Sequence, residues 1–185
     1  MKEIFEKEFG IVPIEIKKLN GYENINYLVK TNTDSFVFKT YPFSNSIFAL
    51  TEAENEALLF LQNDFEDKIP NPIPFIDGSY TKNIEINGVI LTCRMLSFLV
   101  GTFIGDLKTE KAMSSSLGSF LAHMDLVLMN FDNPILRCRK CKWDIQQLLL
   151  NRKYITDIPK IPNQNLVRYF FMQFEQHVMP ILPEL

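Results

Sequence analysis

The sequence predicts an α+β fold, in which a small antiparallel sheet with one long helix is followed by a helical second half. Three observations carry this prediction. Short runs of β-branched and aromatic residues alternate with turn residues up to about Ser97. One stretch among them, Leu50 to Asn63, has helical periodicity. After Gly101 the apolar residues recur every three or four positions instead, which is typical of helices.

Size and composition place the chain among ordinary globular proteins. It has 185 residues, is 46% hydrophobic and carries a formal net charge of −3, which suits one domain or two small lobes. The negative charge does not favour a nucleic-acid partner, and no apolar run is long enough to cross a membrane. Three cysteines without a disulfide framework, and no signal-peptide core, lead us to expect a cytoplasmic protein.

The first elements are a short helix, a strand and a hairpin. Lys2 to Phe9 has helical spacing and ends at Gly10, and Val12 to Lys18 alternates like a strand. The stretch from Leu19 to Lys39 predicts two more strands joined by a turn. In its second strand Phe36 and Phe38 point to one face, while Val37 and Lys39 point to the other.

The next elements are the long helix and a second hairpin. We expect the helix over Leu50 to Asn63, with Thr51 as its N-cap. Prolines make Ile69 to Pro74 an extended connector, and Phe75 with Ile76 is predicted to start a strand. Asn87-Gly88 is the strongest hairpin signal in the chain.

The second half is predicted to be helical. Helices are expected over Thr109 to Asn130, Trp143 to Tyr154 and Leu166 to Val178. Prolines separate these segments, since proline interrupts helical hydrogen bonding.

Several of these stretches resemble one known family. The segments LNGYENINYLVK, FVFK, RMLSFLVGT, LGSFLAHMDLVLMNFDNP and WDI resemble the aminoglycoside phosphotransferase-like kinases, which share the protein-kinase-like fold. Within that family the chain most resembles the hydroxylysine kinase group and the kinase domains fused to class III aminotransferases. The resemblance runs from about Ile11 to His177. It implies a nucleotide-binding N-lobe over residues 1–97, then a hinge and the first helices of an incomplete C-lobe over residues 98–185.

The resemblance also implies roles for particular residues. Gly21, Tyr22, Asn24 and Asn26 match the loop over the nucleotide phosphates, and Lys39 matches the lysine that contacts the α- and β-phosphates. The main chain of Ser97 and Leu99 matches the hinge that pairs with the purine edge, with Met95 and Leu96 as an apolar wall.

A carboxylate on the following helix should orient Lys39. Glu54 lies on the same side of that helix as Leu58 and Leu61 and is our first choice. Glu52 and Glu56 remain alternatives.

By resemblance the chain belongs to a kinase that uses ATP or GTP with Mg²⁺ and phosphorylates a small hydroxylated amine such as 5-hydroxy-L-lysine. The family's catalytic loop has the form H-x-D-x4-N. His123 to Asn130 matches it letter for letter, but the match falls in a strongly helical stretch, so we reject it as that loop. We therefore expect no catalytic or metal-binding residue in this chain, and no kinase activity from it alone. The sequence leaves open whether the chain is a fragment, a splice form or a degenerate copy of such a kinase. The alternative function is a non-catalytic pseudokinase or nucleotide-binding module.

Overall fold

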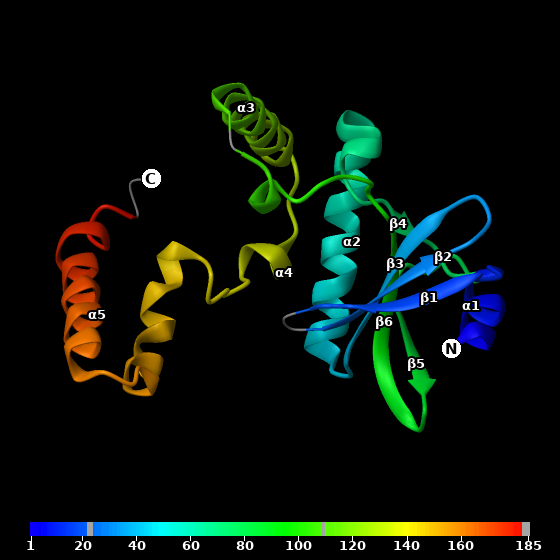
Figure 1. The fold of residues 1–185 in the computed structure, drawn as a ribbon, viewed down its shortest axis with the longest axis horizontal. Helices are drawn as coiled ribbons and strands as arrows, with labels where there is room; N and C mark the ends of the chain where they lie inside the picture. The colour runs from blue at the N-terminus through cyan, green and yellow to red at the C-terminus, as the bar shows by residue number, and fades with distance from the viewer. Residues whose placement is uncertain (22–23, 109, 183–185) are drawn as a thin grey trace. The chain divides into compact units, whose positions relative to one another are not determined.

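The computed structural model describes residues 1–21, 24–108 and 110–182. It divides into two compact units, Met1–Arg137 and Cys138–Leu185 (Figure 1). The first unit contains the sheet and several helices, and the second is helical. The predicted α+β class is therefore confirmed. Compactness divides the chain at a different place from the lobe boundary expected after residue 97, which stays a prediction.

The sheet is antiparallel throughout and combines the three consecutive strands β1, β2 and β3 with the β5–β6 hairpin. Its order is β1-β2-β3-β6-β4, with β5 also paired to β6. Asn87 and Gly88 connect β5 to β6 with φ values of 53° and 79°, the left-handed conformations that a tight hairpin turn requires. This predicted hairpin is confirmed. The strands are β1 Glu15–Leu19, β2 Ile25–Lys30, β3 Ser35–Pro42, β4 Pro72–Ile73, β5 Lys82–Ile86 and β6 Val89–Ser97.

One face of the sheet is covered by α1 (Lys2–Phe9), and we call it the α1 face. Phe38 of β3 points to it and is fully buried, with its ring edge-on to that of Phe5 at 5.0 Å between centroids. Phe36 packs against the same cluster. Val37 and Lys39 therefore lie on the opposite face, as the alternation predicts. We call this second face the α2 face, because helix α2 packs on it.

Cys93 of β6 lies in the core of the α1 face with no exposed surface. Burial raises the pKa of its thiol to about 12, so the reactive thiolate is scarce. We expect a thiol reagent at pH 8 to modify Cys138 and Cys141 in the folded protein, and Cys93 only after denaturant is added. A Cys93→Ala variant should react to the same extent as the wild type before denaturant is added, and should show no further reaction afterwards. Modification of all three thiols in the folded protein, before denaturant is added, would contradict this packing.

Helix α2 (Asn45–Phe65) begins earlier than predicted. Its N-cap is Ser44, whose hydroxyl accepts a hydrogen bond from the Ile47 amide at 3.1 Å. The expected N-cap, Thr51, was wrong. It is buried inside the helix, and its hydroxyl donates to the Ile47 carbonyl at 2.8 Å. Because serine is a favourable N-cap residue, the helix begins directly after Ser44 and not at the predicted Leu50.

The connector after α2 also departs from the prediction. A 3-10 turn, η1 (Glu66–Lys68), leads to β4, where Pro72 is tolerated because this short strand lies at the end of the sheet order. The strand expected at Phe75 and Ile76 is wrong. The Phe75 amide donates to the Ser79 carbonyl and the Ile76 amide to Glu8, so this segment is a turn that packs beside α1.

The rest of the first unit consists of η2 (Ile104–Asp106), α3 (Lys111–Leu128) and α4 (Pro134–Arg137). Phe65 at the end of α2 packs against two residues of α3, Phe120 at 5.3 Å and His123 at 4.8 Å between ring centroids. The H-x-D-x4-N match thus begins within a helix, as expected, and its histidine stacks on a buried phenylalanine.

The second unit contains η3 (Ile145–Asp157), α5 (Ile161–Gln173) and the π-helical turn η4 (Phe174–Val178). The helix expected from Trp143 is a 3-10 helix capped by the Asp144 carboxylate. Arg152 of η3 donates to Glu175 of η4 at 2.5 Å, which ties the segments together. In the parts of the chain that the structure describes, no helix has the length and apolar character needed to cross a membrane.

Candidate functional site

Lys39 lies at the centre of the α2 face, between Asn26 of β2 and Arg94 of β6 in the strand register. Directly opposite residues in neighbouring strands have Cβ atoms about 5 Å apart, so these three polar side chains are neighbours. The adjacent row on the same face is apolar and consists of Leu28, Val37 and Leu96. The α2 face thus carries a polar row beside an apolar row.

The charge of Lys39 is incompletely compensated. Removal from water lowers its pKa most, the Arg94 guanidinium lowers it further, and the Glu54 carboxylate opposes both effects. Burial and a like charge disfavour the protonated amine, and only a nearby anion restores it. The surroundings of Lys39 therefore favour an additional negative charge.

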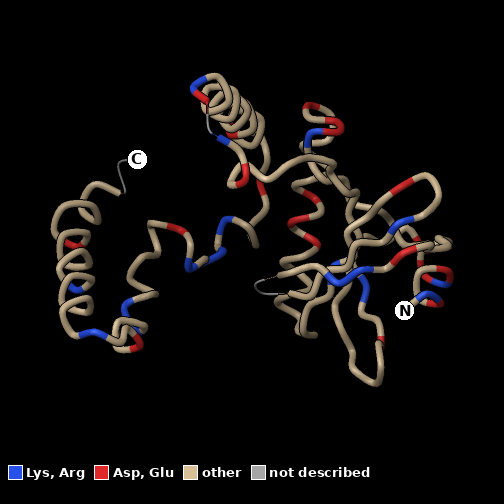
Figure 2. The backbone as a smooth tube through the Cα atoms, in the orientation of Figure 1, with Lys and Arg blue, Asp and Glu red and all other residues tan. Residues whose placement is uncertain are grey.

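Three acidic residues of α2 compete as the partner of Lys39, and acidic residues recur along this helix (Figure 2). Glu54 is close enough to affect Lys39 and also binds Arg94 at 2.5 Å. Glu56 instead accepts a hydrogen bond from Asn133 at 2.7 Å. Glu52 has a buried oxygen without a hydrogen-bond partner among the described residues. The geometry therefore places Glu54 best for the predicted role.

Sequence reasoning missed Arg94. It is only 6% exposed, and it donates to Asn55 at 3.1 Å, Tyr41 at 3.1 Å and Glu54 at 2.5 Å. The signal was a single charged residue inside the apolar strand Thr92-Cys93-Arg94-Met95, since such a residue is buried only when it is paired.

Gly21 lies close against Asn24 and Asn26 just before and at the start of β2. A Cβ atom on Gly21 would collide with the Asn24 main-chain carbonyl oxygen and would lie 2.8 Å from the side-chain nitrogen Nδ2 of Asn26, so close approach requires glycine here. The Asn26 side-chain oxygen is buried and finds no hydrogen-bond partner in the described residues. Since Asn26 is opposite Lys39, the loop before β2 ends beside the lysine. Tyr22, a predicted loop residue, lies outside the described residues.

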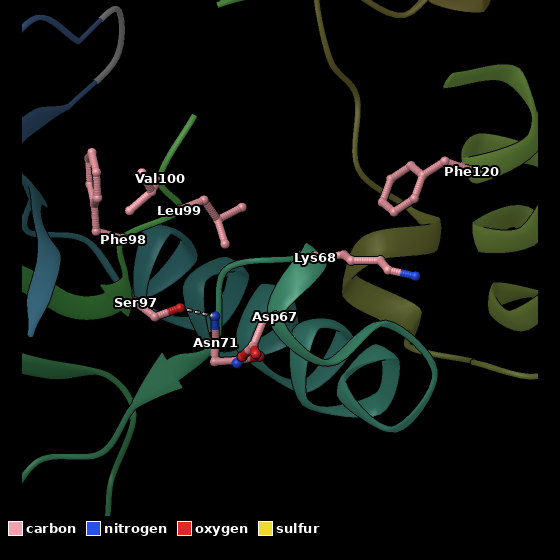
Figure 3. A pocket seen from close by; sticks show the side chains of 8 residues that line it. All are labelled: Asp67, Lys68, Asn71, Ser97, Phe98, Leu99, Val100 and Phe120. Carbon is pink, nitrogen blue, oxygen red and sulfur yellow. Dashed lines mark hydrogen bonds between the residues drawn. The ribbon is translucent and has the colours of Figure 1, made fainter. Parts of the chain in front are cut away.

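The predicted hinge residues line a separate cavity of about 640 Å³ at the end of β6 (Figure 3). Ser97 and Leu99 are both part of its wall, whereas Lys39 is not among the lining residues described. The lining is Asp67, Lys68, Asn71, Ser97, Phe98, Leu99, Val100 and Phe120. The structure therefore brings the predicted site residues together as two groups, one around Lys39 and one at the hinge.

Two hinge expectations change in detail. The Ser97 amide donates to the Asn71 carbonyl and its hydroxyl accepts from the Asn71 amide, both at 2.8 Å. These groups of Ser97 are thus used to join β6 to the connector. Met95 points into the core of the α1 face, so it cannot share a wall with Leu96, which lies on the α2 face. Leu99 is 42% exposed and faces the cavity.

The described residues near Lys39 and the hinge do not form a metal site. Across residues 1–21, 24–108 and 110–182, no group of three or more His, Cys, Asp or Glu side chains comes together that could hold an ion.

No family model matches the chain, but three curated proteins are similar to it over almost its whole length. All three are hydroxylysine kinases: 22% identical in Danio rerio over 98% of this chain, 23% in Xenopus laevis over 97%, and 25% in Mus musculus over 95%. The matched part is 53%, 52% and 51% of those proteins. This chain thus spans about half the length of the curated relatives it matches.

Solved structures share its fold at low sequence identity. A microcompartment-associated aminopropanol kinase matches with a TM-score of 0.58 at 16% identity, over 78% of this chain and 44% of its own. A spectinomycin phosphotransferase in complex with ADP and spectinomycin matches at 0.57 and 13%, over 95% of this chain and 52% of its own.

An amicoumacin kinase in complex with AMP-PNP, Ca²⁺ and Ami matches with a TM-score of 0.57 at 14% identity, over 92% of this chain and 52% of its own. These likenesses confirm the predicted protein-kinase-like fold. In sequence, this chain is thus similar to hydroxylysine kinases over about half of their length, and in fold it is similar to small-molecule kinases and phosphotransferases.

Proposed function

We propose that this chain binds a purine nucleotide on the α2 face and forms the nucleotide-binding part of a small-molecule kinase. The observation that carries the proposal is Lys39, a partly buried cation beside a second cation and opposite Asn26, against which Gly21 packs closely. Both features favour a bound polyanion. The complexes of similar proteins with ADP and with AMP-PNP support a nucleotide as that anion.

Each group of residues has a part in this proposal. The Lys39 amine donates to the α- and β-phosphates, and Glu54 keeps the amine in place. Main-chain amides of the Gly21–Asn26 loop cover the phosphates, because backbone N–H groups in tight loops bind anions well. On the same face Leu28, Val37 and Leu96 supply apolar contact to the base. The main chain of Leu99 pairs with the purine edge.

The names of the relatives support hydroxylysine as the phosphate acceptor of the whole kinase, and we propose its 5-hydroxy-L form. We propose ATP or GTP as the phosphate donor, and the ADP and AMP-PNP complexes of similar proteins support an adenine nucleotide. A divalent metal such as Mg²⁺ neutralises charge on the nucleotide phosphates when bound. Because this chain spans about half of those relatives, phosphoryl transfer is proposed for the whole kinase.

A second candidate is a nucleotide-binding module without transfer activity. It is favoured by α3, which carries most of the H-x-D-x4-N match in a regular helix and packs His123 against Phe65. A helix does not supply the irregular loop that positions a substrate hydroxyl.

Calorimetric titration with MgATP, MgGTP and MgADP tests the binding proposal. We expect saturable binding with a dissociation constant between about 1 μM and 1 mM, the usual range for enzyme substrates. A parallel assay of phosphate transfer to 5-hydroxy-L-lysine, with lysine as the matched control, is expected to show no turnover by this chain alone. No saturation by any of the three nucleotides would refute the proposal.

The pKa of Lys39 provides a prediction about pH. In the free protein this pKa is lowered from the ordinary lysine value of 10.5. The protonated amine therefore destabilises the fold at any pH below the folded-state pKa, and stability rises as the pH increases from that pKa to the ordinary lysine value. Bound phosphates stabilise the protonated form, so the pKa should rise when MgADP binds. NMR titration of ¹³C-labelled lysine measures this shift. An unchanged or further lowered Lys39 pKa at saturating MgADP would show that the phosphates lie elsewhere.

A further inference from the structure

Arg94 joins helix α2 to the sheet at the level of Lys39. One terminal nitrogen, Nη1, donates to the Asn55 side-chain oxygen at 3.1 Å, and the other, Nη2, donates to Glu54 at 2.5 Å. A guanidinium taken out of water requires partners of this kind. Because Arg94 and Lys39 are register partners on the same face, these bonds fix the part of α2 that faces the lysine.

The Asn55 amide is held so that its oxygen faces the guanidinium. Asn55 is only 2% exposed, and its Nδ2 atom donates to the Tyr80 carbonyl at 3.2 Å and to the Thr81 hydroxyl at 3.0 Å. With both of its donors used there, Asn55 offers an acceptor to Arg94 in one orientation. The guanidinium therefore has a defined position before any ligand binds.

Tyr41 extends this set of contacts towards the loop. Its hydroxyl accepts from Arg94 Nη2 at 3.1 Å, and the guanidinium carbon lies 5.8 Å from the centre of its ring. The Asn24 side chain also hydrogen-bonds to this hydroxyl. A phenol oxygen can accept two such bonds. Side chains of Asn24, Tyr41, Arg94 and Glu54 thus connect the loop before β2 with helix α2.

We propose that Arg94 and Tyr41 are positioning residues of the nucleotide site, which hold Asn24 of the loop and Glu54 of α2 in fixed places beside Lys39. The inference rests on the nucleotide binding proposed above. A phosphate chain under the loop contacts the loop and Lys39 together, so loss of either placement weakens binding. Apolar side chains can hold a helix against a sheet as well as a buried ion pair does. They cannot, however, orient the Glu54 carboxylate and the Asn24 side-chain amide.

Tyr41→Phe is the sharper of two test variants, because it removes one hydroxyl and keeps the ring. Calorimetry with MgADP should show affinity weakened by about three- to tenfold, the usual effect of one hydrogen bond, with a melting temperature close to that of the wild type. The matched control is Tyr27→Phe, since Tyr27 lies on β2 and packs against Phe38 on the α1 face. Its affinity for MgADP should be unchanged.

Arg94→Lys separates geometry from charge, since lysine keeps the charge but lacks the planar fork. We expect it to weaken MgADP binding at least as much as Tyr41→Phe. Wild-type affinity in both variants, within a factor of two, would overturn the inference while leaving nucleotide binding intact. Equal weakening in Tyr27→Phe would also overturn it, because the effect would then be general. If the wild type itself binds no MgADP, the proposed function and this inference both fail. Should Arg94→Lys not fold, Tyr41→Phe decides.

Discussion

Replacing Phe38 with alanine is expected to lower the free energy of unfolding by about 3–5 kcal/mol, the usual cost of removing a buried aromatic ring. Phe38 has no exposed surface and contacts Phe5, Phe9 and Tyr27, with ring centroids 5.0, 6.0 and 6.4 Å away. A cavity would open between α1 and the sheet. Urea unfolding, followed by circular dichroism and by the accessibility of the Cys93 thiol, measures the loss.

The matched control is Phe43→Ala, because Phe43 follows the same strand and is 50% exposed. It should change the free energy of unfolding by less than about 0.5 kcal/mol. A Phe38→Ala variant that loses less than about 1 kcal/mol, or no more than Phe43→Ala, would contradict the packing of the α1 face. That packing also matters for function, because a shift of one residue in β3 would turn Lys39 away from α2.

Lys39→Met is expected to weaken MgADP binding by about 10- to 100-fold, since hydrogen bonds to a charged group contribute about 1.5–3 kcal/mol. Methionine keeps most of the apolar stem and removes the amine. The folded protein should be as stable as the wild type or slightly more so, because its surroundings already disfavour the protonated amine. Calorimetry and thermal unfolding measure the two effects separately.

Lys18→Met serves as the comparison for Lys39→Met. Lys18 lies on β1 opposite Tyr27, so it belongs to the other face of the sheet, and its side chain is exposed. Its removal should leave MgADP affinity within a factor of two. Similar weakening in both variants would mean that the nucleotide responds to net charge rather than to a site at Lys39.

Local patterns were sufficient to predict most of the sheet. Alternation in β3 placed Phe38 and Lys39 on opposite faces, and Asn87-Gly88 fixed the β5–β6 hairpin through backbone conformations that few other residues adopt. Periodicity located α2 but not its start. Ser44 is as common in turns as at helix N-caps, and only the structure shows that its hydroxyl accepts a hydrogen bond from the Ile47 amide. The turn at Phe75 was missed because its amide bonds to Ser79 rather than to a neighbouring strand.

The arrangement around Lys39 could be predicted only in part. The lysine and Glu54 came from resemblance and from helix geometry, and the structure brings them close enough to interact. Arg94 and Tyr41 could not be found in this way. Their contact depends on β6 pairing with β3, and sheet order is a long-range property that no local pattern specifies. Ser97 was assigned to the hinge, but its amide and hydroxyl bind Asn71. Asn71 comes just before β4, and it reaches Ser97 because β4 pairs with β6, which is again a long-range pairing.

Labelling with an acyl-phosphate derivative of ATP tests the central claim most directly. A lysine amine near the bound phosphates attacks the acyl carbonyl, an amide forms, and the nucleotide leaves with its phosphate. Binding of the nucleotide holds the acyl group beside the Lys39 amine, so this amine should react faster than lysines that meet the reagent only by collision. After digestion and mass spectrometry, we predict the acyl group on Lys39, with labelling suppressed by excess ATP. Labelling that is spread over exposed lysines away from this face, such as Lys2 and Lys18, and that ATP does not reduce, would contradict a nucleotide site on the α2 face.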